Sequence, residues 1–468
     1  MVSARLLAAV AMGKLAGVAS RSLGRGGGTA LPGLLALKLA PNLVLDLTAQ
    51  ISGGSILITG TNGKTTTSRM VATILRQWGL EPLHNKSGSN LMRGIATALL
   101  DKASLSAALS ADNTTIGLFE VDEAVLPQAV WEIKPKVVAI GNLFRDQLDR
   151  YGEVDRLSTI WRKTLAELSP EAMVVLNGDD PLVADLGRGL RNRVVYFGVE
   201  DKSYGQEQLE HAADSKCCPQ CGVHYDYDLS FYGHIGHYRC PSCGGQRPEP
   251  HIKAKRLEMR GFEGIHMELA TPTAELEVEL ALPGIYNVYN ALAAAGVAHA
   301  LGVPAALIKS GLESFTAAFG RAEVVNVKGR RVCLVLVKNP VGLNAVLRAL
   351  SAEQGPKKVL FVLNDRIADG RDVSWIWDAD FEKMAGATSF VLCSGLRAED
   401  MALRLKYAGI SDGDALIVER DPGKALELAL SYTAPGETLY LLPTYTAMLE
   451  VRELLAKMGH LEHFWEVA

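Results

Sequence analysis

The sequence lacks several features that would place it in a specialised class of protein. Its net charge over 468 residues is −4, so no basic excess points to a nucleic-acid partner. No uninterrupted apolar run approaches the roughly 20 residues of a membrane span, and there is no long internal repeat or low-complexity tract. What remains, 48% hydrophobic and 21% charged residues, is typical of a globular protein of about two to four domains.

The sequence also lacks the cysteine pattern of a disulfide framework. Four of its seven cysteines form two close pairs, Cys218 with Cys221 and Cys240 with Cys243. Cys333 and Cys393 stand singly inside apolar runs. This usage suits a reducing compartment, so we expect a cytoplasmic protein.

The first 20 residues, MVSARLLAAVAMGKLAGVAS, have the small and apolar residues of a signal peptide, but Lys14 interrupts them. A helix fits better, with one apolar face formed by Leu6, Leu7, Val10, Leu15 and Val18. We expect this amphipathic helix to pack on the body of the protein or on a partner. Peripheral contact with a membrane, at the inner face of the plasma membrane, is the remaining alternative.

From residue 56 onward, apolar β-type runs alternate with helical patterns, which predicts an α/β fold with parallel strands and crossover helices. A segment rich in Cys, Gly, Tyr, His and Pro interrupts the rhythm at 205–250, and a second α/β series begins after residue 321. The predicted domains are therefore an N-terminal helix with a Gly-rich segment, a central domain, and a smaller Rossmann-like C-terminal domain, at 1–50, 51–320 and 321–468.

The stretch ITGTNGKTTT follows the apolar run SILI and opens a helical pattern. Two glycines can turn the backbone so that its N–H groups face an anion, and a helix N-terminus adds partial positive charge. Lys64 could reach the terminal phosphates of a nucleotide, and the Thr65 hydroxyl suits a magnesium ion. The alternative is a plain strand-to-helix turn. The predicted ATP-binding loop comprises Gly60, Thr61, Asn62, Gly63, Lys64, Thr65 and Thr66.

This short loop resembles that of the Mur ligase family, whose members use ATP to turn a carboxylate into an acyl phosphate that an amine then attacks. The resemblance implies a magnesium-binding role for Glu120, at the end of FEVDE. GNLFRDQLDRYGE (141–153) is similar to the family's NLxxDHLDxHG segment, and LPGIYNVYNALAAA is similar to its GxHNxxNALAA segment. By this resemblance Asn287 and Asn290 approach the adenine, and Arg321 in GRAEVV lies near the nucleotide.

Several positions depart from the family pattern. Gln147 replaces a histidine that binds magnesium, although its amide oxygen could still coordinate the ion. Trp161 aligns with a lysine that many Mur ligases carbamylate, and Lys163, two positions away, would face elsewhere on a helix. Val335 replaces an aspartate, and only about 50 residues precede the loop, too few for the family's N-terminal substrate domain.

The two CPxC pairs are separated by eighteen residues, which is the spacing of a four-cysteine zinc ribbon. Cys218, Cys221, Cys240 and Cys243 would fill all four positions of a structural zinc ion. Cys217 is out of phase with this pattern. The alternatives are free thiols, a redox pair, or replacement of one cysteine by a histidine from the set His224, His234 and His237.

Together with this ribbon, the aspartate-rich stretch VLNDRIADGRDVSWIWDADFE (362–382) resembles one branch of the family, the MurT subunits of lipid II isoglutaminyl synthase. On its own the stretch could be a polar loop packed by Trp375 and Trp377. The resemblance implies a heterodimer with a GatD-type glutaminase, whose ammonia is used to amidate the α-carboxylate of D-glutamate in lipid II. It also implies ATP, Mg²⁺ and structural Zn²⁺ as cofactors.

The expected catalytic groups at the ATP site are Lys64 and Glu120. The resemblance also implies that an aspartate of the C-terminal domain completes the glutaminase site of the partner, and we expect this residue to be Asp365. Asp365 follows a predicted strand, where functional groups gather in open α/β sheets, and Asp369 and Asp372 are the alternatives. Two other functions stay open: a stand-alone Mur-type ligase that joins an amino acid to a carboxylate, and a nucleotide-binding scaffold without catalysis.

Overall fold

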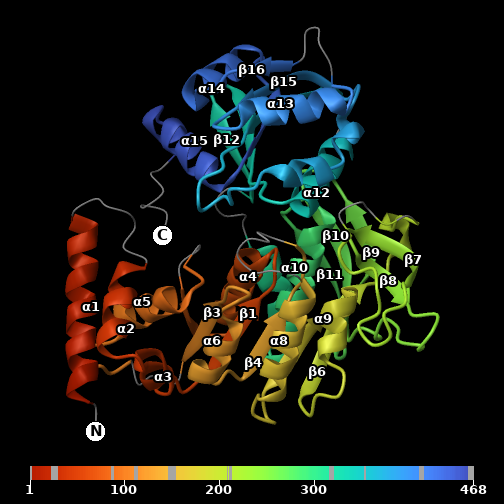
Figure 1. Ribbon diagram of the computed structural model, residues 1–468. Coiled ribbons are helices and arrows are strands. Elements are labelled where there is room, and N and C mark those ends of the chain that lie inside the picture. The colour runs from red at the N-terminus through yellow and green to blue at the C-terminus, as the bar shows by residue number, and fades with distance from the viewer. Residues whose placement is uncertain are drawn as a thin grey trace.

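The computed structural model describes residues 3–22, 30–85, 89–109, 114–145, 154–207, 209, 213–315, 321–352, 355–410 and 416–461. Two α/β units are stacked one above the other, and the chain passes between them once (Figure 1). The lower unit is built on a nine-stranded sheet, and the upper unit on a six-stranded sheet.

The nine-stranded sheet has the order β11-β10-β9-β6-β5-β4-β1-β3-β2. From β9 to β2 neighbouring strands run parallel, and β9, β10 and β11 form an antiparallel extension. The predicted parallel α/β sheet is confirmed, whereas the short strand β2 and the strands β9 and β10 were not predicted. The strands are β1 (Ser55–Thr59), β2 (Glu81–His84), β3 (Thr115–Glu120), β4 (Val137–Ile140), β5 (Met173–Asn177), β6 (Arg193–Val199), β9 (Ile252–Met259), β10 (Ile265–Thr271) and β11 (Ala274–Leu280).

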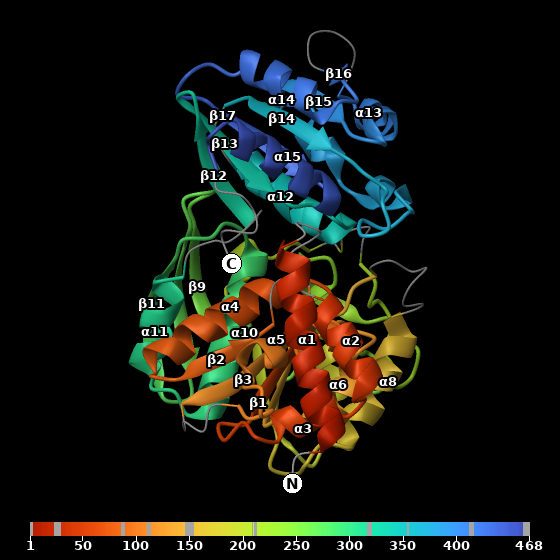
Figure 2. The same cartoon turned by 90° about the vertical axis from the view of Figure 1, so that its left-hand side faces the viewer.

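Helices cover both faces of this sheet, and each face has its own apolar core. One core is formed with α4 (Lys64–Gln77), α10 (Ile285–Leu301) and α11 (Ala305–Glu313). On the other face, which lies on the right in Figure 2, the helices are α1 (Ala4–Ser22), α2 (Leu31–Leu39), α3 (Leu43–Thr48), α5 (Met92–Lys102), α6 (Leu126–Ile133), α8 (Val154–Ala166) and α9 (Pro181–Leu186). Burial on both faces explains why the central strands are uniformly apolar.

The six-stranded sheet has the order β12-β13-β17-β14-β15-β16, parallel except for the β12–β13 pair. Its strands are β12 (Arg321–Val327), β13 (Arg330–Val335), β14 (Lys357–Val362), β15 (Thr388–Ser394), β16 (Leu416–Val418) and β17 (Thr438–Pro443). Four helices and two 3-10 turns pack on it: α12 (Pro340–Ala352), α13 (Ala398–Tyr407), α14 (Pro422–Ser431), α15 (Tyr445–Lys457), η2 (Ser374–Asp378) and η3 (Phe381–Met384).

The register of the central strands determines where the candidate site lies. Ile58 of β1 pairs with Glu120 of β3 on one side and with Ala139 of β4 on the other. The segments that follow these three strands therefore leave the sheet at the same edge. In Figure 1 this edge faces the upper unit, so residues from both units can meet there.

The segment between β6 and β9 leaves the sheet and returns as a small separate hairpin. The hairpin consists of β7 (Asp226–Tyr232) and β8 (Ile235–Arg239), with the 3-10 turn η1 (Lys202–Tyr204) before it. Each CPxC pair flanks one of the two strands. The predicted interruption at 205–250 thus corresponds to an inserted ribbon.

The N-terminal helix was predicted correctly, but its predicted apolar face was wrong. Leu6 and Val10 are buried against α2 and α5, whereas Leu7, Leu15 and Val18 of the same predicted face are exposed. The buried side also includes small residues, because Gly13 lies against the side chain of Leu100. In the described part of the chain, no helix has both the length and the apolar character needed to span a bilayer.

Candidate active site

The nucleotide loop connects β1 to α4 and has the backbone that its glycines permit. Gly60 and Gly63 have φ angles of +137° and +84°, which L-residues with side chains rarely adopt. A Cβ atom on Gly63 would lie 1.9 Å from Asn290 Oδ1, so glycine is required there for two reasons. The loop brings the N-terminus of α4, which suits an anion, to the sheet edge.

Lys64, the first residue of α4, is folded back over the loop. Its Nζ donates to the carbonyl oxygens of Gly60 (2.6 Å) and Thr61 (3.3 Å) and to Glu123 Oε2 (3.0 Å). Burial alone would lower the pKa of Lys64, but the carboxylates of Glu123, Glu120 and Asp122 together raise it. The ammonium is therefore a charged group held at the mouth of the loop. Glu123 was not predicted as a site residue.

Thr65 and Glu120 lie together, as expected for a shared magnesium ion. Thr65 Oγ1 donates to Glu120 Oε1 over 3.1 Å, and the carboxyl group of Glu120 is buried. Asn85 fixes the backbone of Glu120 with two hydrogen bonds of 2.9 Å. A hydroxyl and a carboxylate are oxygen ligands of the kind that Mg²⁺ prefers, so these groups fit the ion. Gln147 lies outside the described residues.

Residues after β4 hold the other side of the loop. The Asn142 side chain accepts from the backbone N–H of Asn62 (2.8 Å) and donates to its carbonyl oxygen (3.0 Å). The hydroxyl of Thr61 donates to the Phe144 carbonyl oxygen (3.2 Å) and accepts from the Phe144 N–H (3.0 Å). The segment GNLF, which the sequence marked only by resemblance, is therefore part of the loop's framework.

The upper unit also reaches the loop. Asn339 Nδ2 donates to Asn62 Oδ1 over 2.9 Å, and Lys338 Nζ lies 3.5 Å from the Thr61 carbonyl oxygen. Both residues lie in the segment VLVKNP (335–340), which begins with the buried Val335 that replaces the family's aspartate. Sequence reasoning missed this contact because the two segments are 277 positions apart.

The two asparagines of α10 are buried beside the loop. Asn290 Oδ1 accepts from Thr67 (3.3 Å), and Asn290 Nδ2 donates to Asn287 Oδ1 (3.0 Å). Asn287 in turn donates to the Pro283 carbonyl oxygen at 2.7 Å. Arg321 begins β12. The roles of these three residues toward the adenine and the nucleotide remain predictions.

The position that aligns with a carbamylated lysine in many Mur ligases is occupied by a structural residue. Trp161 is fully buried, and its indole N–H donates to the Glu123 carbonyl oxygen at 3.0 Å. Trp161 therefore supports the residue that pairs with Lys64. Lys163 is exposed on the outside of α8, in agreement with the prediction that it faces elsewhere.

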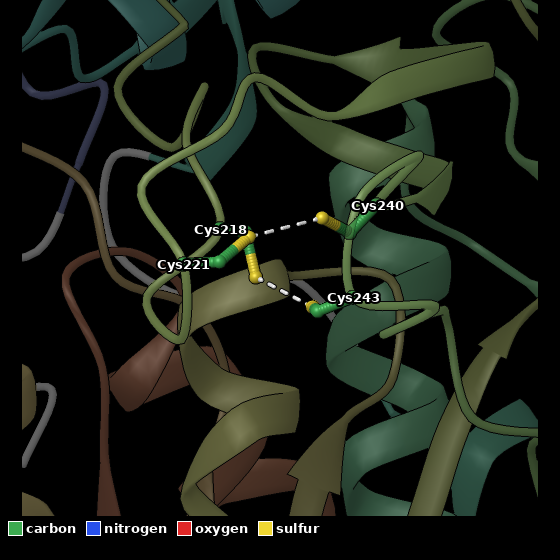
Figure 3. Close-up of side chains that lie close together, drawn as sticks. All are labelled: Cys218, Cys221, Cys240 and Cys243. Atoms are coloured by element: carbon green, nitrogen blue, oxygen red, sulfur yellow. Dashed lines mark hydrogen bonds between the residues drawn. The ribbon is translucent and has the colours of Figure 1, made fainter.

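The four predicted cysteines form one cluster between the two knuckles of the ribbon (Figure 3). Cys218 and Cys243 are 3.6 Å apart at sulfur, Cys221 and Cys240 are 3.4 Å apart, and all four sulfurs lie within 4.8 Å of one another. A tetrahedral zinc ion with bonds of about 2.3 Å would separate its sulfurs by about 3.8 Å. A hydrogen bond from the Cys243 backbone N–H is the largest cause that lowers the pKa of Cys240 to about 6. A backbone hydrogen bond from Gly245 would lower the pKa of Cys243, but the side chains of Cys240 and Cys218 raise it to about 11. Within the cluster, the thiolate that a metal needs is therefore favoured at Cys240.

The histidine alternatives do not join this cluster. His237 Nε2 bonds to the Val199 carbonyl oxygen at 2.8 Å, and the buried His234 lies 3.4 Å from Asp180. His224 is 4.0 Å from the sulfur of Cys217, outside the four-cysteine set. Within the ranges that the structure describes, the four cysteines are the only group of three or more His, Cys, Asp or Glu residues that lie close enough together to hold a metal.

The ribbon hairpin touches the framework of the nucleotide loop. The rings of Phe144 and His234 are 4.5 Å apart, and Phe144 lies 5.8 Å from the ring of Tyr232. At the turn between β7 and β8, a Cβ atom on Gly233 would lie 2.8 Å from the Phe144 ring and 3.7 Å from Val341 of α12. The turn therefore sits where the loop framework and the upper unit meet.

A buried ion pair fixes the other end of the ribbon. Asp179 accepts from Arg247 Nε (2.6 Å), from the Tyr289 hydroxyl (2.6 Å) and from the Val199 N–H (2.8 Å). Burial alone would lower the pKa of Arg247, but Asp179 and Glu200 raise it well above its ordinary value. This network joins the ribbon to β6 and to α10, the helix that carries Asn287 and Asn290.

The three candidate aspartates of the upper unit have different surroundings. Asp365 follows β14, pairs with Arg397 at 3.1 Å and lines an open hollow of about 590 Å³ with Arg366, Ile367, Ala368 and Arg371. Asp369 is buried and accepts from the backbone N–H (2.7 Å) and hydroxyl (2.5 Å) of Thr446 at the start of α15. Asp372 is exposed and accepts from the Ser374 N–H at 2.8 Å.

Comparison with known proteins agrees with this geometry. Residues 58–235 match the Mur ligase middle domain, and residues 336–448 match the MurT ligase C-terminal domain. The chain is 34% identical over 448 residues to the lipid II isoglutaminyl synthase subunit MurT of Staphylococcus aureus strain COL, covering 96% of this chain and 97% of that one. It is also 34% identical to the MurT subunit of Streptococcus pneumoniae R6, covering 95% of this chain and 96% of that one.

Among solved structures, a pseudomurein peptide ligase type C from Methanothermus fervidus has the same fold. Its TM-score is 0.66 at 24% identity, over 88% of this chain and 80% of that one. Fold and loop together define a Mur ligase, a class of ligases that use ATP and Mg²⁺. Within that class, the chain belongs to the MurT family.

Proposed function

We propose that this chain is the ATP-using subunit of a lipid II isoglutaminyl synthase. Its reaction would be amidation of the α-carboxylate of D-glutamate in the lipid II stem peptide to D-isoglutamine. The observation that carries this proposal is the likeness to two MurT subunits over almost the whole chain. Domain limits of 1–50, 51–320 and 321–468 are part of the proposal.

The first step is phosphoryl transfer at the nucleotide loop, residues Gly60 to Thr66. An oxygen of the substrate carboxylate attacks the γ-phosphorus of ATP, the bond to the leaving ADP oxygen breaks, and an acyl phosphate forms. Lys64 must exchange its contacts with the Gly60 and Thr61 carbonyls for phosphate oxygens, while Glu123 keeps it protonated. Its charge then offsets the charge that develops on the transferred group.

Two metals belong to the proposal. Thr65 and Glu120, with Gln147, would hold Mg²⁺, which supplies positive charge beside the phosphates when it is bound. Cys218, Cys221, Cys240 and Cys243 would hold Zn²⁺ with no open position, so this metal would have a structural role. Asn287, Asn290 and Arg321 would complete the ATP site.

The second step is nitrogen transfer. Ammonia attacks the acyl carbon, inorganic phosphate leaves, and the nitrogen loses a proton to give the neutral amide. We propose that a GatD-type glutaminase in a heterodimer supplies the ammonia. Because lipid II is a membrane lipid, the enzyme would work in the cytoplasm at the inner face of the plasma membrane.

Among the three aspartates, the surroundings favour Asp365 as the residue that serves the partner's glutaminase site. Its carboxylate is partly exposed beside an open hollow, where an incoming histidine could reach it. Both oxygens of Asp369 are already used by Thr446. Asp372 holds its own turn. Asp365→Asn should lower glutamine hydrolysis by the complex, while ammonium salts restore amidation.

The test combines the chain with a GatD-type glutaminase, lipid II, ATP and glutamine, and measures both ADP and the amidated lipid. Lys64→Ala should abolish both products and leave partner binding unchanged. Lys163→Ala, an exposed lysine of α8, is the matched control and should retain activity. Amide formation with an added amino acid and no glutaminase would instead favour a stand-alone ligase. ATP binding without glutamine-dependent ADP release would favour a scaffold.

A further inference from the structure

The outward face of α1 is unusual for a surface helix. Its exposed stripe follows helical spacing and consists of apolar residues: Ala4, Leu7, Ala8, Leu15 and Val18, with the half-buried Ala11 between them. Leu15 is 71% exposed and Val18 is 57% exposed. A helix on the surface of a globular protein normally turns polar residues to water. Here the buried side of the helix is apolar, and so is the exposed stripe between Arg5 and Lys14.

The neighbouring helix α2 extends this apolar surface. Leu31 is 48% exposed, and Leu34 and Leu39 are also exposed. The two helices pack side by side along one flank of the lower unit, where α1 is the outermost layer (Figures 1 and 2). Exposed apolar side chains gathered on two packed helices are typical of an interaction site.

Charge indicates which partner this surface fits. The first carboxylate of the sequence is Asp46, and the 45 residues before it carry five cations: Arg5, Lys14, Arg21, Arg25 and Lys38. Arg5 and Lys14 lie on opposite borders of the α1 stripe, and Lys38 is exposed on α2. The rest of the chain is acidic overall, because the whole protein has a net charge of −4. Apolar residues between cations are typical of helices that lie in the interface of an anionic bilayer.

We propose that the α1–α2 surface, defined by the exposed residues Leu7, Leu15, Val18, Leu31, Leu34 and Leu39, docks on an anionic lipid bilayer. Its aliphatic side chains enter the headgroup region, and its cations face the lipid phosphates. The docked protein is peripheral. This inference extends the proposed function, since a membrane-bound substrate would then be presented to an enzyme already held at the same surface.

The first test measures binding of the full chain to vesicles by co-sedimentation. Phosphatidylglycerol vesicles should bind the protein, phosphatidylcholine vesicles should bind it several-fold more weakly, and added salt should reduce binding to the anionic vesicles. Leu15→Ser should weaken binding about tenfold, because one leucine side chain no longer leaves water. Leu403→Ser, on α13 of the upper unit and 49% exposed, is the matched control and should bind like the wild type.

The second test separates this inference from the proposed function. The double variant Leu15→Ser/Val18→Ser should amidate detergent-solubilised lipid II at the wild-type rate, but should lose several-fold with lipid II in phosphatidylglycerol vesicles. Equal losses with both substrates would overturn the docking surface. Wild-type protein that amidates neither substrate would contradict the proposed function, whatever the vesicles bind.

Two other occupants of the surface would give different results. A second copy of the chain would appear as a dimer in sedimentation velocity that Leu15→Ser dissociates. A glutaminase subunit would protect α1 from hydrogen exchange when it is added. Either result without binding to anionic vesicles would refute the proposal.

Discussion

Replacement of Gly63 by alanine, which adds one methyl group, should perturb the nucleotide site beyond its effect on the stability of the fold. Gly63 has a φ angle of +84°, and its Cβ position lies 1.9 Å from Asn290 Oδ1. Ordinary contact begins at 3.4 Å, so the Asn290 side chain would have to retreat by about 1.5 Å. Gly63→Ala therefore moves a residue of α10 as well as straining the loop.

The expected magnitude has two parts. Alanine at a left-handed backbone position costs about 1 to 2 kcal/mol of stability. Displacement of Asn290 also breaks its hydrogen bonds with Thr67 and Asn287, each contributing about 1 kcal/mol. Because the hydrogen bonds of Asn290 lie inside the nucleotide site, their loss should lower the affinity for ATP by roughly tenfold to thirtyfold.

The other end of α4 supplies the control. Gly79 has nearly the same φ angle, +82°, but no atom lies within 4 Å of its Cβ position. Gly79→Ala should show the backbone cost in urea unfolding and bind ATP like the wild type in calorimetry. If Gly63→Ala also binds ATP as tightly as Gly79→Ala, Asn290 does not shape the nucleotide site and the reasoning fails.

Three further changes have expected outcomes of their own. Cys240→Ser should release zinc, measured with a chromogenic chelator. It should also raise the Kd for ATP, because the ribbon turn contacts Phe144 of the loop framework. An unchanged Kd would show that the cysteine cluster does not influence the nucleotide site. Burial, with Arg69 and Arg76, lowers the pKa of His84 to about 4. The contribution of the neutral side chain to the free energy of unfolding is therefore present above pH 6.5 and is lost as the pH falls through 4. Between pH 6.5 and pH 4 the wild type should therefore lose up to about 3 kcal/mol more of its free energy of unfolding than His84→Gln loses. Equal losses in the two proteins would contradict this origin. Asp369→Asn should lower the melting temperature by weakening the start of α15 while the folded complex keeps its glutaminase activity, and loss of that activity would transfer the role of Asp365 to Asp369.

Local geometry is what the sequence predicted well. Gly60 and Gly63 around a lysine after a buried strand, and two CPxC pairs at ribbon spacing, each determine geometry within a few residues. Both groups are assembled in the structure as the spacing indicated. The alternation of apolar runs with helical patterns likewise gave the parallel sheets, because each strand is buried on both faces.

Contacts between distant segments could not be predicted in this way. Glu123 lies 59 positions from Lys64, and Asn339 lies 277 positions from Asn62, so no local pattern connects either pair. The error at α1 has a different cause. Apolar spacing identifies a helix, but when residues on every side are apolar it cannot tell which side the protein buries.

The nucleotide loop is supported from both units, and this arrangement gives the ribbon a role beyond its own cysteine cluster. Asn142 and Phe144 hold the loop from within the lower unit, and Asn339 holds it from the upper unit. The turn at Gly233 lies against both Phe144 and α12, so it occupies the junction where those two supports meet. A metal bound by the four cysteines would fix the base of the hairpin, and the contacts of Asp179 with Arg247 and Tyr289 tie the segment after the hairpin to α10. Removal of that metal should therefore free the turn, and the loop should lose its alignment with the upper unit.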